Sequence, residues 1–196
     1  MSKNNSNKSS LRISFNSPVI LGFTMICLVS LLLNVLTHGA SNNLVFSVYR
    51  SSMVNPMTYI RFFGHVFGHA SWEHFMGNIT YILLLGPLLE EKYGKADMAM
   101  IIAVTALVTG LINFIFFPHI QLLGASGVVF AFILLSSITG FQNGKIPLTF
   151  ILVAVIYIGQ QVYSGIFKDN DISELTHIIG GIVGSFFGFA ENKIKR

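Results

Sequence analysis

A serine stands between two glycines at Gly124-Ala125-Ser126-Gly127, where a loop is predicted to turn into an apolar helix. Glycine permits the tight backbone conformations of such a turn, and the free N–H groups of a helix N-terminus carry partial positive charge. These features suit a nucleophile whose attack on a carbonyl creates an oxyanion. The same short pattern also describes an N-cap serine at a glycine turn, so it indicates chemistry only together with other residues.

A histidine near the start of the last apolar segment, His177, is the candidate base for this serine. Four glycines follow it at offsets of three, four, seven and eleven: Gly180, Gly181, Gly184 and Gly188. In a helix all four share the face of His177, and such a face lets two membrane helices approach closely. The segment after Ser126 offers a matching pair of small residues, Gly127 and Ala131. Packing of the two faces would carry His177 toward Ser126; the alternative is a packing helix with an incidental histidine.

A third polar group comprises His69, His74 and Asn78. His74 and Asn78 are four residues apart and lie one above the other on a helix face. Neutral imidazole and amide groups donate hydrogen bonds without the cost of a buried charge, so they could face a developing oxyanion. The spacing of His65, His69 and His74 also allows a zinc site, which takes three protein ligands and a water. Because HExxH is absent and Glu73 is the only carboxylate nearby, we predict no metal and no other cofactor.

The composition indicates a membrane protein. Of the 196 residues, 53% are hydrophobic and only 10% are charged, with a mean hydropathy of +0.68, whereas soluble domains carry roughly 25% charged residues. The formal net charge of +4 does not indicate a nucleic-acid partner, because the basic residues sit at the ends and in short loops. The single cysteine, Cys27, excludes an intrachain disulfide.

The apolar segments predict an all-α membrane protein with a bundle of six transmembrane helices, since each span needs about 20 residues. The helices are expected at residues 18–37, 74–93, 97–117, 125–140, 147–163 and 175–190, the second interrupted at Gly86-Pro87. Residues 38–73 form a long loop, in which 57–67 is aromatic but carries Arg61 and His65 and is expected to be half-embedded. The membrane domain is expected to span 18–190, between a disordered tail at 1–17 and a short basic tail at 191–196.

The basic residues predict the orientation of the bundle. With six spans both termini share one side, and that side holds nine of the twelve Lys and Arg residues, against Arg50, Arg61 and Lys168 on the other. The positive-inside rule therefore puts both termini in the cytoplasm. We expect a multi-pass integral membrane protein in the plasma membrane of a bacterium.

Together these residues resemble the rhomboid proteases over about residues 45–190. The matching positions are Arg61, His65, His69, His74, Asn78, Glu90, Gly94, the GASG of 124–127, and His177 with Gly180 and Gly184. The resemblance implies that Ser126 is the nucleophile and His177 the general base. It implies that His74, Asn78 and the backbone N–H of Ser126 line the oxyanion hole, and that Glu90 tethers the inner end of the second helix.

Two positions depart from the family's pattern. The family commonly has Trp-Arg in the first loop, where this chain has Ile60-Arg61, so an interfacial aromatic is missing. Many members have a tyrosine four residues after the serine, on which the histidine stacks, and here that residue is Phe130. A phenyl ring can also stack, so we expect Phe130 to orient His177. The other supporting residues are expected to be Gly124, Gly127, His69, Arg61 and Glu90.

The residues thus predict an intramembrane serine protease with a Ser126–His177 dyad that lacks a third, carboxylate member. Its partners would be membrane lipid and transmembrane protein substrates, cut near the outer membrane boundary. One rival function is a catalytically silent rhomboid-like protein that binds transmembrane clients, against which the intact dyad argues. The other is a small transporter with a histidine proton path. Its expected mid-span carboxylate is absent, because Glu90 and Glu91 lie at the inner helix end.

Overall fold

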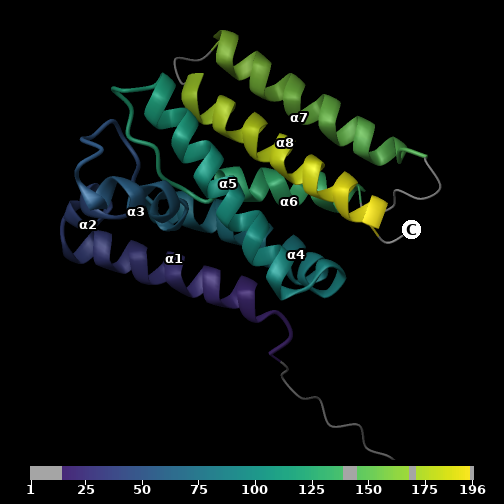
Figure 1. Ribbon diagram of the computed structural model, residues 1–196, viewed down its shortest axis with the longest axis horizontal. Coiled ribbons are helices and arrows are strands. Elements are labelled where there is room, and N and C mark those ends of the chain that lie inside the picture. Colours follow the sequence, from purple (N-terminus) through teal and green to yellow (C-terminus); the bar gives the residue numbers. More distant parts are fainter. Residues whose placement is uncertain (1–14, 139–144, 168–170, 195–196) are drawn as a thin grey trace, which may run out of the picture.

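The computed structural model describes residues 15–138, 145–167 and 171–194 and is helical. Its elements are α1 (Pro18–Leu36), α2 (Ala40–Leu44), α3 (Pro56–Gly64), η1 (His65–Phe67), α4 (Trp72–Tyr93), α5 (Lys95–Phe116), α6 (Ser126–Ile138), α7 (Leu148–Phe167) and α8 (Asp171–Ile194). The long helices form a bundle, and the short α2 and α3 lie together beside one end of it (Figure 1). The predicted all-α class is confirmed.

Helix α6 is the central element of the bundle. Nine of its thirteen residues are buried, and it packs against α4, α5, α7 and α8. A helix that is covered on most sides must be apolar nearly all round, as the sequence of 126–138 is. The helix that begins at Ser126 is therefore positioned by neighbours on several sides.

Helix α8 packs against α6 along the predicted glycine face. A Cβ atom at Gly180 would collide with the carbonyl oxygen of Gly127, and one at Gly184 would collide with that of Ala131. The two backbones are therefore closer than any intervening side chain would allow, which is how small residues join membrane helices. The predicted packing of the two small-residue faces is confirmed.

Helix α4 is continuous and fastened to α1, so the predicted interruption at Gly86-Pro87 is wrong. Proline removes one backbone donor, but packing on α1 supports the helix here, since a Cβ at Gly86 would lie 2.7 Å from Cδ1 of Ile20. Near the end of α4, the buried carboxylate of Glu90 accepts hydrogen bonds from the backbone N–H groups of Val19 (3.1 Å) and Ile20 (3.0 Å). These bonds satisfy free donors at the start of α1 and tether the end of α4.

The last two helices are longer than predicted. Helix α7 continues to Phe167 instead of ending at 163, and α8 covers 171–194 instead of 175–190. Apolar periodicity fades at these ends, but a helix already stabilised by packing can add polar turns, because each further residue brings a backbone hydrogen bond. Most of the predicted tail at 1–17 and the predicted helix end at 139–140 lie outside the described residues.

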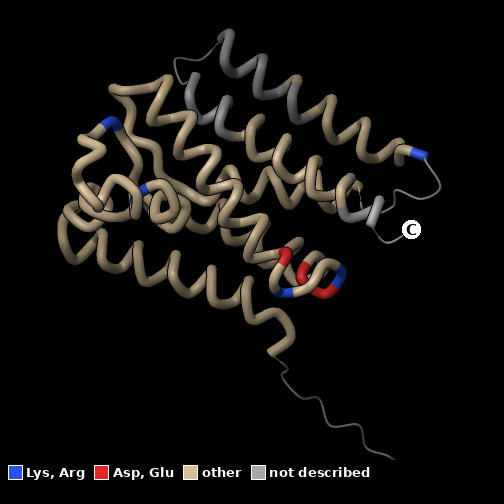
Figure 2. The backbone as a smooth tube through the Cα atoms, viewed as in Figure 1, with Lys and Arg blue, Asp and Glu red and all other residues tan. Residues whose placement is uncertain are grey.

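The surface of the bundle exposes large apolar side chains. They include Leu36 (75% exposed), Leu148 (67%) and Phe186 (69%), and soluble monomers rarely expose large continuous apolar areas. Charged residues cluster where α4 meets α5, and others lie in the short segments beside the ends of the long helices (Figure 2). Among the described helices, α1 and α5 are both long and apolar enough to cross a bilayer. This surface suits hydrocarbon better than water.

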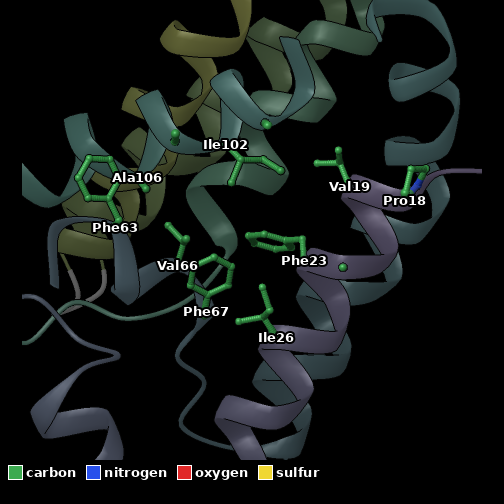
Figure 3. A pocket seen from close by; sticks show the side chains of 12 residues that line it. Pro18, Val19, Phe23, Ile26, Phe63, Val66, Phe67, Ile102 and Ala106 are labelled. Atoms are coloured by element: carbon green, nitrogen blue, oxygen red, sulfur yellow. The ribbon is translucent and has the colours of Figure 1, made fainter. Parts of the chain in front are cut away.

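An apolar cavity of about 350 Å³ lies between α1, the α3–η1 segment and α5 (Figure 3). Phe23 and Ile26 of α1 face Phe67 and Ile102 across it. None of the described residues that line it has a titratable or nucleophilic side chain. The cavity therefore offers no group for proton transfer or nucleophilic attack.

We expect Gly184→Leu to destabilise the protein, because a leucine side chain cannot be placed without moving α8 away from Ala131. Overpacking costs about 1–3 kcal/mol, so the melting temperature in detergent should fall by roughly 5 °C. The matched control is Gly159→Leu in α7, where a Cβ would meet nothing within 4 Å. Equal melting temperatures for the two variants would contradict the close approach of α8 to α6.

Candidate active site

Four residues singled out from the sequence meet in one cavity of about 390 Å³, which we call the polar cavity. Ser126 comes from α6, His177 from α8, and His74 and Asn78 from α4. The other lining residues are Glu73, Gly77, Tyr81, Leu122, Leu123, Val129 and Phe130. A hydroxyl, two imidazoles and an amide therefore converge on a space whose wall is otherwise largely apolar.

The imidazole of His177 stacks on the ring of Phe130, as predicted. The ring centroids are 4.1 Å apart and the ring planes are within 6° of parallel. Phe130 is four residues after Ser126 in α6 and shares its helix face, so the stacking holds the imidazole over the face that carries the hydroxyl. This stacking restrains the position and tilt of the imidazole ring.

The loop before Ser126 has a conformation that favours glycine. Gly124 has a φ angle of +126°, and a Cβ on it would lie 2.7 Å from Nε2 of His74. Its backbone N–H donates to the carbonyl oxygen of His65 at 2.9 Å. Gly124 therefore allows the loop to pass directly against the His74 ring, which brings that ring beside the start of α6.

The same loop is fastened to the long loop that follows α1. Val48 and Leu122 exchange two backbone hydrogen bonds, each 2.9 Å long. The buried amide of Asn113, in α5, donates to the carbonyl oxygens of Val48 and Ile120, both at 3.1 Å. The segment that leads into Ser126 is therefore held by partners from two distant parts of the chain.

His69 is buried behind Asn78 and positions it. Its Nδ1 lies 3.1 Å from the carbonyl oxygen of Phe67, which can only accept, so Nδ1 carries the proton. Its Nε2 then accepts a hydrogen bond from the amide nitrogen of Asn78 at 3.2 Å. Burial, and to a lesser degree nearby His74, lowers the pKa of His69 to about 4. The ring is therefore neutral near pH 7, as this arrangement requires.

His74 lies in the first turn of α4. Its backbone N–H donates to the hydroxyl of Ser71 at 3.2 Å, which caps the helix. Its ring contacts His69 edge-on, with 5.1 Å between centroids. The imidazole of His74 and the amide of Asn78 both reach the cavity, so the face predicted from their spacing is confirmed.

The other predicted residues of the long loop lie outside the cavity wall. Buried Arg61 donates from Nε to the carbonyl oxygen of Leu44 at 2.9 Å, and its guanidinium lies over the ring of Tyr49. Nε2 of His65 lies 3.0 Å from the carbonyl oxygen of Ala106, on α5. In the part of the chain that the structure describes, no three His, Cys, Asp or Glu side chains could together hold a metal ion.

Sequence reasoning missed part of the cavity wall. Glu73 and Tyr81 lie on α4, and Leu122 and Leu123 lie in the loop before α6. Tyr81 could have been found, because an offset of seven from His74 puts it on the same helix face. The two leucines had no comparable signal, since their place depends on a backbone bridge to a distant loop.

Comparison with known proteins identifies the family. The Rhomboid domain model matches residues 56–193. Rhomboid-related protein 1 of Caenorhabditis elegans is 30% identical over 140 residues, which are 66% of this chain and 39% of the relative. Rhomboid protease GlpG of Haemophilus influenzae is 25% identical over 140 residues, 69% of this chain and 71% of the relative. Rhomboid-type serine protease 2 of Kluyveromyces lactis is 24% identical over 174 residues, 79% of this chain and 62% of the relative.

The chain belongs to the rhomboid family, because the domain match covers more than half of it. The matched range includes all the residues that line the polar cavity. A rhomboid domain makes the chain an integral membrane protein, in agreement with its exposed apolar surface.

We expect Gly124→Ala to slow the labelling of Ser126 by a fluorophosphonate probe by roughly ten- to a hundredfold, because displacements near 1 Å in a reactive site cost this much. The added Cβ would press on the His74 ring and strain the backbone at a φ angle of +126°. Gly94→Ala is the matched control, with a φ angle of +90° and nothing within 4 Å of the added Cβ. If both variants are labelled as fast as the wild type, Gly124 does not position the site.

Proposed function

We propose that this protein is an intramembrane serine protease that cleaves transmembrane proteins through a Ser126–His177 dyad. The observation that carries the proposal is the single cavity that these two residues line together with His74 and Asn78. A hydroxyl, a stacked imidazole and two neutral side-chain donors are groups that acyl transfer uses. Two relatives are named as rhomboid proteases, which supports the same activity.

In the proposed first half-reaction, Oγ of Ser126 attacks the carbonyl carbon of a peptide bond while His177 takes the hydroxyl proton. The C–N bond then breaks, the amine leaves with the proton from His177, and an ester on Ser126 remains. In the second half-reaction, water gives a proton to His177 and attacks the ester. The carboxylic acid is released and Ser126 regains its proton. The stack on Phe130 keeps the imidazole in place during these transfers.

Each tetrahedral intermediate carries a negative oxygen that needs donors. We assign the His74 ring, the Asn78 amide and the backbone N–H of Ser126 to this task. The N-terminus of α6 adds partial positive charge at the same place. The Asn78 amide donates one of its N–H groups to Nε2 of His69, so the second N–H remains for the oxyanion.

We assign the six membrane spans to α1, α4, α5, α6, α7 and α8, and place the α2–η1 segment half-embedded at the outer surface. The membrane domain is then residues 18–190, with 1–17 and 191–196 in the cytoplasm. The orientation rests on the excess of Lys and Arg at the termini, at the α4–α5 junction with Lys92 and Lys95, and at Lys145 before α7. A bacterial plasma membrane is the proposed location.

A substrate helix would approach the site sideways from the lipid. An apolar groove of about 340 Å³ between α4, α6 and α7 shares Tyr81 with the polar cavity, which supports such a route. The carbonyl of a helical peptide bond is hydrogen-bonded, so the substrate must unwind locally before attack. Glycine or proline near the cut lowers the cost of unwinding.

We expect Ser126→Ala and His177→Ala each to abolish cleavage of a single-span substrate by the purified protein. The losses should not add in the double variant, because nucleophile and base act as a unit. Product formation is measured on gels, and melting temperature shows that the variants are folded. Ser52→Ala and His38→Ala, at exposed loop positions, are matched controls that should cleave normally. Substantial cleavage by the Ser126→Ala variant would contradict the proposed mechanism.

We expect cleavage near the outer membrane boundary, with release of the external part of the substrate. Model substrates carry Gly or Pro in either the outer or the inner half of one span, and mass spectrometry locates the cut. Cleavage should be faster with the helix breaker in the outer half, because unwinding is then easier beside Ser126. Efficient cutting in the inner half, or indifference to the helix breaker, would refute this placement.

A further inference from the structure

Glu73 is the one charged side chain among the described residues that line the polar cavity. It directly precedes His74 in the first turn of α4, and its side chain is exposed. A carboxylate that is exposed yet lines the cavity stands at the cavity's rim.

The arginines described at this end of the bundle are engaged elsewhere. Arg61 is buried and donates from Nε to the carbonyl oxygen of Leu44. Arg50 donates to the carbonyl oxygens of Phe114 and Ile115 at 3.1 and 3.4 Å. Neither of these two described arginines is therefore used to neutralise the negative charge at the rim.

A charge at the mouth of this cavity acts on the chain that passes it, attracting cations and repelling anions. In the proposed orientation, the rim faces the external medium. The part of a substrate beside Glu73 is then the segment just external to the scissile bond. External flanks of membrane helices carry few Lys and Arg residues. A preference for Lys or Arg just external to the cut would therefore restrict the protease to a small set of substrates.

We propose that Glu73 is a specificity-determining residue that favours substrates with Lys or Arg just external to the scissile bond and disfavours Asp or Glu there. The inference rests on the proposed protease function and adds a substrate class to the same site. It requires no part for Glu73 in the chemical steps.

The test is a competition between three single-span substrates that differ at one position just external to the cut, which is Lys, Gln or Glu. Mass spectrometry gives the ratio of kcat/KM for each pair with the wild type, Glu73→Gln and Glu73→Lys. We expect the wild type to prefer Lys over Glu by roughly three- to tenfold, as exposed ion pairs allow. Glu73→Gln should bring the ratio near one, Glu73→Lys should invert it, and added salt should weaken the wild-type preference.

The ratio of kcat/KM for two substrates within one variant does not depend on the stability of that variant or on the amount of active protein, because both substrates compete for the same enzyme. Glu91→Gln and Glu91→Lys are the matched controls, because Glu91 is an exposed acid near the opposite end of α4. Both controls should keep the wild-type ratio. A Lys-to-Glu ratio that is the same in wild type and Glu73→Lys overturns the assignment of Glu73 and leaves the proposed protease intact. If the wild type cuts none of the substrates and Ser126 does not react with a serine probe, the proposed function itself fails.

Discussion

The contact between the backbones of α6 and α8 is the constraint on which the site depends. Gly180 lies against Gly127 and Gly184 against Ala131, with no room for a side chain at either glycine. Helices in lipid gain little from burying apolar surface against each other, so close fit has to hold them together. Because Ser126 directly precedes Gly127 and His177 lies one turn before Gly180, the same contact also sets how the two side chains lie relative to each other.

A second set of contacts supports the side of the cavity that carries the donors. In a membrane domain, polar groups must find partners within the protein, because the hydrocarbon offers none. Here His69 is bound to both Phe67 and Asn78, and Asn113 joins the two loops that meet beside the start of α6. The long loop after α1 is thus part of the frame of the site.

The two sets of contacts act on different groups. Helix packing places the hydroxyl and the imidazole, whereas hydrogen bonds from the loops place the amide of Asn78 and the backbone of Gly124. The two sets of contacts meet at Gly124, because this residue lies shortly before Ser126 in the chain and against the His74 ring. Glycine adopts the φ angle of +126° found at that point without strain, so the loop can keep this geometry.

The sequence by itself determined the helical class, the approximate helices, and the small-residue faces of α6 and α8. These features are periodic or local, so composition and spacing carry them. It also placed His74 and Asn78 on one face and Phe130 under His177, because each pair depends on helical offsets or on a family resemblance. Only the tertiary structure decided that α4 passes unbroken through Pro87, that His69 supports Asn78 from behind, and that Leu122 and Leu123 line the cavity. Those outcomes depend on contacts between distant segments, such as Gly86 with Ile20 and Val48 with Leu122, and such contacts leave no periodic trace in the chain.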